Sequence, residues 1–162
     1  MDMRGWFAPQ QGGKTMFDKI LVPVDGSKLS LNAVRVAVEI ARERQARLVL
    51  LNVQMPYQPP AFAEVPMALP MSEKEYDEAV RRASQKLLSD ATRLPHAAGL
   101  QYQTVTRIAL SPWKAIITVA RSRGIDLIVM ASHGRRGLAG MLLGSETQKV
   151  LTHCTVPVLV TR

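Results

Sequence analysis

Glycines and arginines that could hold an anion follow a predicted buried strand in the second half of the chain. The β-branched run at residues 126–130 predicts that strand, and glycines follow it at positions 134, 137, 140 and 144. A helix that begins at Gly144 and Ser145 would direct free N–H groups and the positive end of its dipole at an anion. Arg135 and Arg136 would add positive charge nearby. This stretch therefore predicts phosphate binding.

A second set of residues that could bind a ligand follows the first predicted strand: Asp25, Gly26 and Ser27. The Asp25 carboxylate is an acceptor suited to an exocyclic amine, and Gly26 keeps the turn open. If the strands that end at Asp25 and at residue 131 are neighbours, the two groups face one crevice and together suit an adenine nucleotide. The alternative is that the triplet only makes the turn and caps the next helix. Neither the P-loop spacing nor G-x-G-x-x-G occurs in the chain.

Strands and helices alternate along the chain, as hydrophobic periodicity and capping signals indicate. Strands are predicted at 19–24, 47–53, 101–107, 126–131 and 156–160, and helices at 29–44, 72–97, 112–123 and 145–153. Five strands separated by helices imply right-handed crossovers and a parallel sheet. We therefore expect a single α/β domain with helices on both faces of the sheet.

Two segments lack this alternation. Residues 1–15 show no periodicity and are interpreted as a disordered leader, either an upstream extension or a cloning remnant, with Met16 as a candidate start. Residues 54–71 contain five prolines, at positions 56, 59, 60, 66 and 70, and so predict a long loop of the kind that often binds ligands or closes over them.

Composition limits the classes of partner. The 162-residue chain has a net charge of +8, but its arginines are spread over predicted helices, and only 5% of its residues are aromatic, so nucleic acid is not the expected partner. Cys154 is the single cysteine, which excludes an intrachain disulfide and favours a reducing cytoplasm. No apolar run reaches the length of about 20 residues that spans a bilayer, so no membrane partner is expected.

From Met16 to Arg162 the chain resembles the universal stress protein family. The resemblance rests on FDKILVPVDGS at 17–27, LLNV at 50–53, MASHGRRG at 130–137, LGS at 143–145 and VPVLV at 156–160. It implies a Rossmann-like, three-layer α/β domain over residues 16–162, with strand order 3-2-1-4-5. It also implies a homodimer that acts in stress response or signalling.

The ATP-binding branch of that family carries the motif G-x2-G-x9-G-[ST]. Here Gly134 is the second glycine and Gly144-Ser145 ends the motif, while Ala131 replaces the first glycine. The resemblance implies ATP, with or without Mg, as the ligand. It places Asp25 at the adenine, the Val53 backbone at the base, and Gly137 near the phosphates. The implied site residues are Pro23, Val24, Asp25, Val53, Met130, Ala131, Ser132, His133, Gly134, Arg135, Arg136, Gly137, Gly144, Ser145, Glu146 and Thr147.

The final predicted strand suggests a dimer interface. Its residues Val156, Pro157, Val158, Leu159 and Val160 would make an apolar edge that aggregates if left bare, and pairing with a second copy about a two-fold axis would cover it.

Two other functions remain open. One is slow ATP hydrolysis, although no carboxylate pair is placed to activate water, and His133 is interpreted as a structural residue. The other is a nucleotide-free dimeric scaffold or chaperone, which Ala131 supports. We assign no catalytic residue and no protein metal site.

Overall fold

A computed structural model describes residues 16–58, 72–134 and 143–162. The predicted leader at 1–15, most of the proline-rich segment, and Arg135, Arg136 and Gly137 of the glycine loop lie outside the described residues. Among the helices that are described, none has both the length and the apolar character needed to cross a membrane.

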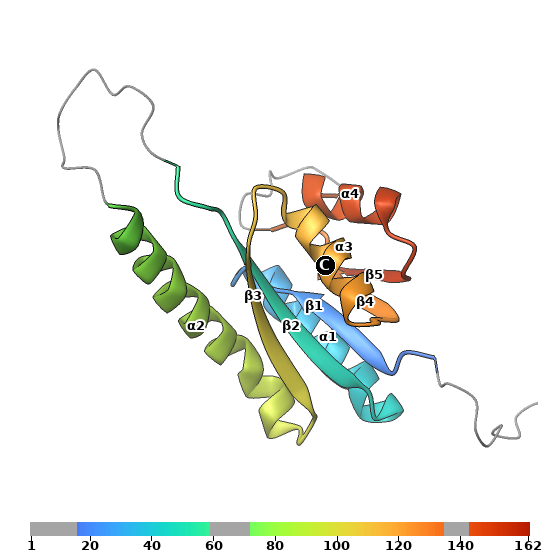
Figure 1. The fold of residues 1–162 in the computed structure, drawn as a ribbon. Helices are drawn as coiled ribbons and strands as arrows, with labels where there is room; N and C mark the ends of the chain where they lie inside the picture. The colour runs from blue at the N-terminus through green and yellow to red at the C-terminus, as the bar shows by residue number, and fades with distance from the viewer. Residues whose placement is uncertain (1–15, 59–71, 135–142) are drawn as a thin grey trace, which may run out of the picture.

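Five parallel strands form one sheet in the order β3-β2-β1-β4-β5, which confirms the expected fold (Figure 1). The elements are β1 Lys19–Pro23, α1 Lys28–Arg44, β2 Arg47–Gln54, α2 Glu73–Ala97, β3 Tyr102–Ile108, α3 Pro112–Ser122, β4 Leu127–Ala131, α4 Ser145–His153 and β5 Val158–Thr161. The central strand β1 pairs with β2 on one side and with β4 on the other. The chain reverses its winding direction between β1 and β4, where ligands of such sheets bind.

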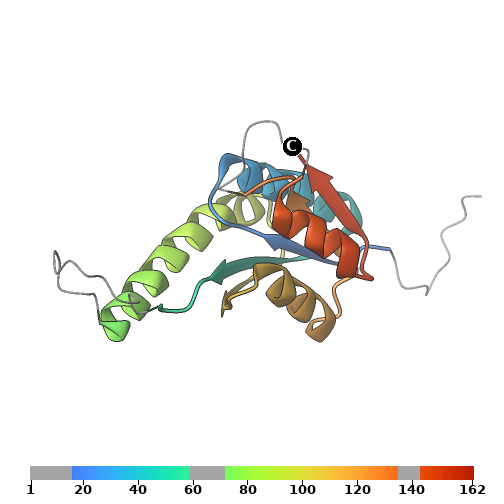
Figure 2. The ribbon, with the colours of Figure 1, turned by 90° about the horizontal axis from the view of Figure 1, so that it is seen from above.

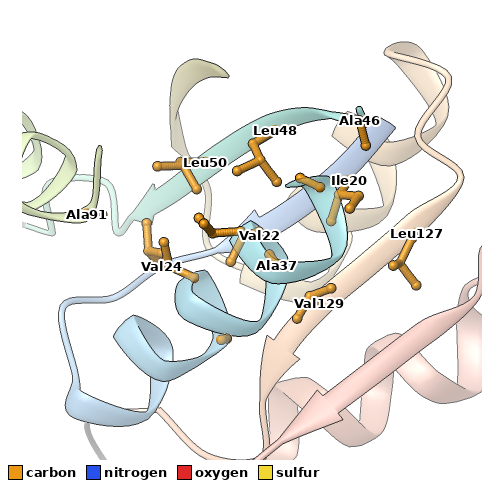
Figure 3. Packing of buried hydrophobic residues seen from close by; sticks show 14 of the residues in the cluster. Ile20, Val22, Val24, Ala37, Ala46, Leu48, Leu50, Ala91, Leu127 and Val129 are labelled. Carbon is orange, nitrogen blue, oxygen red and sulfur yellow. The ribbon is translucent and has the colours of Figure 1, made fainter. Parts of the chain in front are cut away.

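Alternate residues of β1 pack into two different cores. Ile20 and Val22 face α1 and α2, together with Leu48 and Leu50 of the neighbouring β2 (Figure 3). Leu21 faces the opposite side, where α3 supplies Ile116 and other apolar residues. Helices α1 and α3 therefore cover opposite faces of the sheet (Figure 2). Burial on both faces explains why the sequence of β1 is a nearly continuous apolar run.

Local signals set several helix ends where the sequence predicts them. Ser27 Oγ accepts a hydrogen bond from the Ser30 N–H at 3.1 Å and caps α1. At α2, Ser72 and Glu75 form a reciprocal capping box, and the hydrogen bonds from Ser72 hold the pKa of the Glu75 carboxyl below its ordinary value. After α2 and α3 the backbone turns through Gly99 and Gly124, which have positive φ angles of 67° and 60°.

The last strand begins later than predicted. The sequence predicts a strand from Val156, whereas β5 begins at Val158, where its pairing with Ile128 of β4 starts. Pro157 precedes the strand and contributes only its carbonyl, which accepts from the Ile128 N–H at 2.9 Å. Because proline has no N–H, the ladder cannot extend further toward Val156 through this residue.

Candidate functional site

The ends of β1 and β4 converge, as the crevice hypothesis requires. A Cβ atom added to Gly134, just after β4, would lie 2.8 Å from Asp25 Oδ2, just after β1. A side chain at this position would displace the Asp25 carboxylate, so Gly134 allows the loop after β4 to approach that carboxylate.

A cavity of about 200 Å³ lies at this junction. Ten of its lining residues were predicted from the sequence, namely Pro23, Val24, Asp25, Val53, Met130, Ala131, His133, Gly134, Glu146 and Thr147. Three more were not predicted: Leu51, Pro112 and Ile116. The volume is below the roughly 300–1,000 Å³ of pockets that enclose a drug-sized ligand. It therefore suits one part of a nucleotide, such as the base, better than the whole molecule.

Three predicted site residues within the described chain do not line the cavity: Ser132, Gly144 and Ser145. Ser132 is buried, and its N–H donates to the Thr161 carbonyl at 2.7 Å, so its backbone belongs to the β4–β5 junction. The carbonyl of Ser132 accepts from the Gly144 N–H at 2.7 Å. This bond joins the two ends of the glycine loop.

The start of α4 differs in one respect from the sequence expectation. The Gly144 N–H was expected to be free for an anion, but the bond to Ser132 occupies it. A Cβ atom on Gly144 would lie 3.2 Å from the Ser132 oxygen, so a larger residue here would push that carbonyl away by a few tenths of an ångström. Within the described part of the chain no side chain caps α4. The N–H groups of Ser145, Glu146 and Thr147 therefore lack intrahelical acceptors and are those available to an anion.

Thr147 fixes α4 to the sheet. Its Oγ1 donates to the Ala131 carbonyl at 2.9 Å, and this bond is buried. The position that departs from the glycine motif, Ala131, thus has its carbonyl engaged by α4, and the residue also lines the cavity.

Glu146 caps a second helix that points at the cavity. Its Oε2 accepts from the Trp113 N–H at 2.8 Å in the first turn of α3, and its Oε1 lies 3.1 Å from Lys149 Nζ. Ser111 occupies the N-cap position of α3, as predicted, but its side chain makes no capping bond. The local sequence around Ser111 could not reveal this capping because the carboxylate comes from 33 residues away.

Asp25 and His133 complete the polar wall. Asp25 Oδ1 accepts from the Ser27 N–H at 2.9 Å, so the triplet does make the turn, while Oδ2 is the oxygen nearest Gly134. His133 Nδ1 lies 3.2 Å from Ser132 Oγ, and within the described chain its buried Nε2 has no hydrogen-bond partner. The described residues contain no cluster of three or more His, Cys, Asp or Glu side chains that could hold a metal ion.

Comparisons with known proteins agree with this fold. The model of the universal stress protein family matches residues 16–162. The chain is 33% identical over 159 residues to the universal stress protein YxiE of Bacillus subtilis, covering 91% of this chain and 100% of that one.

Two solved structures with the same fold contain adenine nucleotides. A universal stress protein in complex with cAMP has a TM-score of 0.66 and 23% identity, covering 91% of this chain and 98% of that one. The universal stress protein from Archaeoglobus fulgidus in complex with dAMP has a TM-score of 0.62 and 19% identity, covering 91% and 100%.

Proposed function

Because this chain belongs to the universal stress protein family, we propose that it is an adenine-nucleotide-binding module of stress response or signalling, with ATP as its ligand. One observation carries the proposal. The cavity between the ends of β1 and β4 combines the Asp25 carboxylate with the uncapped start of α4. An amine acceptor and a set of phosphate donors therefore lie within one site.

Each part of the nucleotide has a chemical counterpart. Val53, Ile116 and Met130 offer apolar surface to the base, and Asp25 offers an acceptor to the adenine amine. The N–H groups at Ser145–Thr147, which no acceptor within the described residues engages, suit the phosphates. Arg135, Arg136 and Gly137 belong to the proposed phosphate end by the family motif, as does Mg if it accompanies ATP. The two relatives that hold cAMP and dAMP support adenine as the base.

The proposed activity is binding rather than catalysis. No residue is assigned to activate water, and occupancy of the site would change which partner the protein contacts. If multiple-turnover phosphate release were measured, and if Gly144→Asp abolished it, the protein would instead be an ATPase.

A nucleotide-free scaffold is the second candidate, and Ala131 favours it. This cavity-lining residue carries a methyl group where the ATP-binding motif has glycine. We favour retained binding because Gly134, Gly144 and Ser145 keep the rest of the motif.

Calorimetric titration separates these candidates. We expect ATP to bind the purified, nucleotide-stripped protein. If ATP, ADP, AMP and cAMP all fail to bind at millimolar concentration, the nucleotide proposal is wrong and the scaffold candidate replaces it. Mass spectrometry of the freshly purified native protein would show any nucleotide that co-purifies.

We also propose a homodimer through β5 and the residues before it, located in the cytoplasm. Within the described chain β5 pairs only with β4, and Leu159 on its edge is 39% exposed. Leu159→Lys should give a monomer by light scattering. It is a cleaner test than Val158→Lys, because Val158 packs against the core. An unchanged dimer mass would count against this interface.

A further inference from the structure

Strands β1 and β2 separate at the candidate site. Their paired register ends at Pro23 and Leu51, although β2 continues to Gln54 beside β3. The Val24 N–H still donates to the Leu51 carbonyl at 2.8 Å. In a regular parallel ladder the next bond would run from the Val53 N–H to the Val24 carbonyl. Among the described residues no such backbone bond is formed.

The side chain of Asn52 takes the place of that bond. Asn52 Nδ2 donates to the Val24 carbonyl at 2.8 Å, and the residue is only 2% exposed. Its Oδ1 accepts from Gln54 Nε2 at 2.6 Å and from Ser84 Oγ at 2.8 Å. Because both ends of the amide are bonded, its orientation is fixed.

Because the Asn52 side chain, rather than the Val53 N–H, bonds to the Val24 carbonyl, the Val53 peptide group is left facing the cavity. Along β2, peptide groups alternate between the two neighbouring strands, and the Gln54 carbonyl faces β3, where it accepts from the Ala109 N–H at 2.9 Å. The N–H and C=O groups of Val53 therefore face the β1 side, where β1 has ended. Val53 also lines the cavity.

We propose that Asn52 is a positioning residue for the nucleobase. By engaging the Val24 carbonyl it holds the end of β1 apart from Val53, and the Val53 peptide becomes a donor–acceptor pair for the edge of a base. The inference rests on the proposed nucleotide site. Ser84 of α2 supports the amide from the far side, and its Oγ lies 2.9 Å from Thr106 Oγ1 of β3.

Two variants separate positioning from simple structural support. Asn52→Leu removes the donor to Val24, whereas Ser84→Ala removes one acceptor contact of Asn52 and leaves that donor in place. We expect Asn52→Leu to weaken ATP binding at least about tenfold and Ser84→Ala to weaken it less than about threefold. Equal losses in the two variants, or a loss below about threefold in Asn52→Leu, would overturn the proposal.

Amide hydrogen exchange tests the same arrangement without nucleotide, and without a variant that must fold. In the wild-type protein the Val53 amide should exchange on the order of 100-fold faster than the Leu51 amide, which lies within the ladder with β1. Equal protection of the two amides would refute an open Val53 peptide. If ATP does not bind the wild type, the proposed function fails, and this comparison still tests whether the Val53 peptide is open.

Discussion

The two ends of the sheet carry cavities of opposite character. The cavity at the amino end is the larger, about 490 Å³, and its lining includes Lys19, Arg47 and Arg123. The cavity at the carboxyl end is about 200 Å³ and includes two carboxylates, Asp25 and Glu146. By size and charge alone, the amino end would be chosen for a nucleotide.

Helix α3 explains why that choice would be wrong for an anion. It reaches the carboxyl-end cavity with its N-terminal residue Pro112 and the amino-end cavity with its C-cap residue Arg123. The carbonyl groups at the C-terminal end attract cations, and Lys19 Nζ donates to the Arg123 carbonyl at 3.4 Å. Arg123 Nη1 in turn donates to Gln103 Oε1 at 2.8 Å.

Under the proposed assignment, unsatisfied groups indicate the site better than formal charge does. At the amino end two of the three cations already have protein acceptors. At the carboxyl end the first turn of α4 has N–H groups that no acceptor among the described residues engages. We therefore expect substitutions at the two ends to affect ATP binding very differently.

Gly134→Val should have the largest effect. Its Cβ would lie 2.8 Å from Asp25 Oδ2, so either the carboxylate or the loop must move. We expect ATP affinity to fall by more than about 30-fold in a calorimetric titration. Arg47→Gln at the amino end is the matched control and should leave affinity within about twofold. If the control lost as much affinity, the two cavities would have been assigned the wrong way round.

Asp25→Asn should have the next largest effect. The asparagine Oδ1 can still accept from the Ser27 N–H, so the turn is kept, but an N–H donor replaces the acceptor that we propose for the adenine amine. We expect about a tenfold loss of ATP affinity, since hydrogen bonds to charged groups contribute roughly 1.5–3 kcal/mol. Affinity for GTP should rise, because guanine presents an oxygen where adenine has its amine. Unchanged preference between ATP and GTP would remove Asp25 from the base contact.

Glu146→Gln should strengthen binding slightly. Glutamine keeps an acceptor for the Trp113 N–H but removes a negative charge beside the start of α4. A charge near a helix terminus contributes about 0.3–1 kcal/mol, so ATP affinity should rise about two- to fivefold. Affinity that falls instead would mean that Glu146 contacts the ligand or its metal directly.

Ala131→Gly should have the smallest effect on binding, a rise of at most about threefold. Glycine removes the methyl group of this cavity-lining residue and restores the motif glycine. The unfolding free energy should fall by about 0.5–1 kcal/mol, because glycine in a strand loses more backbone freedom on folding. A gain of 100-fold or more would show that the natural protein is adapted against ATP, in favour of the scaffold candidate.

Local signals in the sequence predicted much of the fold. The capping box at Ser72 and the left-handed Gly99 and Gly124 act within a few residues, so α2 and the ends of two helices could be located from the sequence. The start of β5 was misplaced by two residues because the missing N–H of Pro157 matters only through pairing with β4.

The site was less predictable because its contacts join distant segments. Pro112 was recognised only as a helix start and Ile116 only as part of a helix, yet both line the cavity. The capping of α3 by Glu146 and the bond from Asn52 to Val24 span 33 and 28 residues, respectively. Their roles depend on strand order and helix placement, which no local pattern contains.

An NMR titration with ATP tests the central claim most directly, because it reports both ends of the sheet in one experiment. We expect saturable amide shifts at Asp25, Val53, Gly134 and Ser145, with the amides of Arg47 and Gln103 unchanged. Shifts confined to Arg47 and Gln103, or no shift anywhere at millimolar ATP, would contradict a nucleotide site at the carboxyl end.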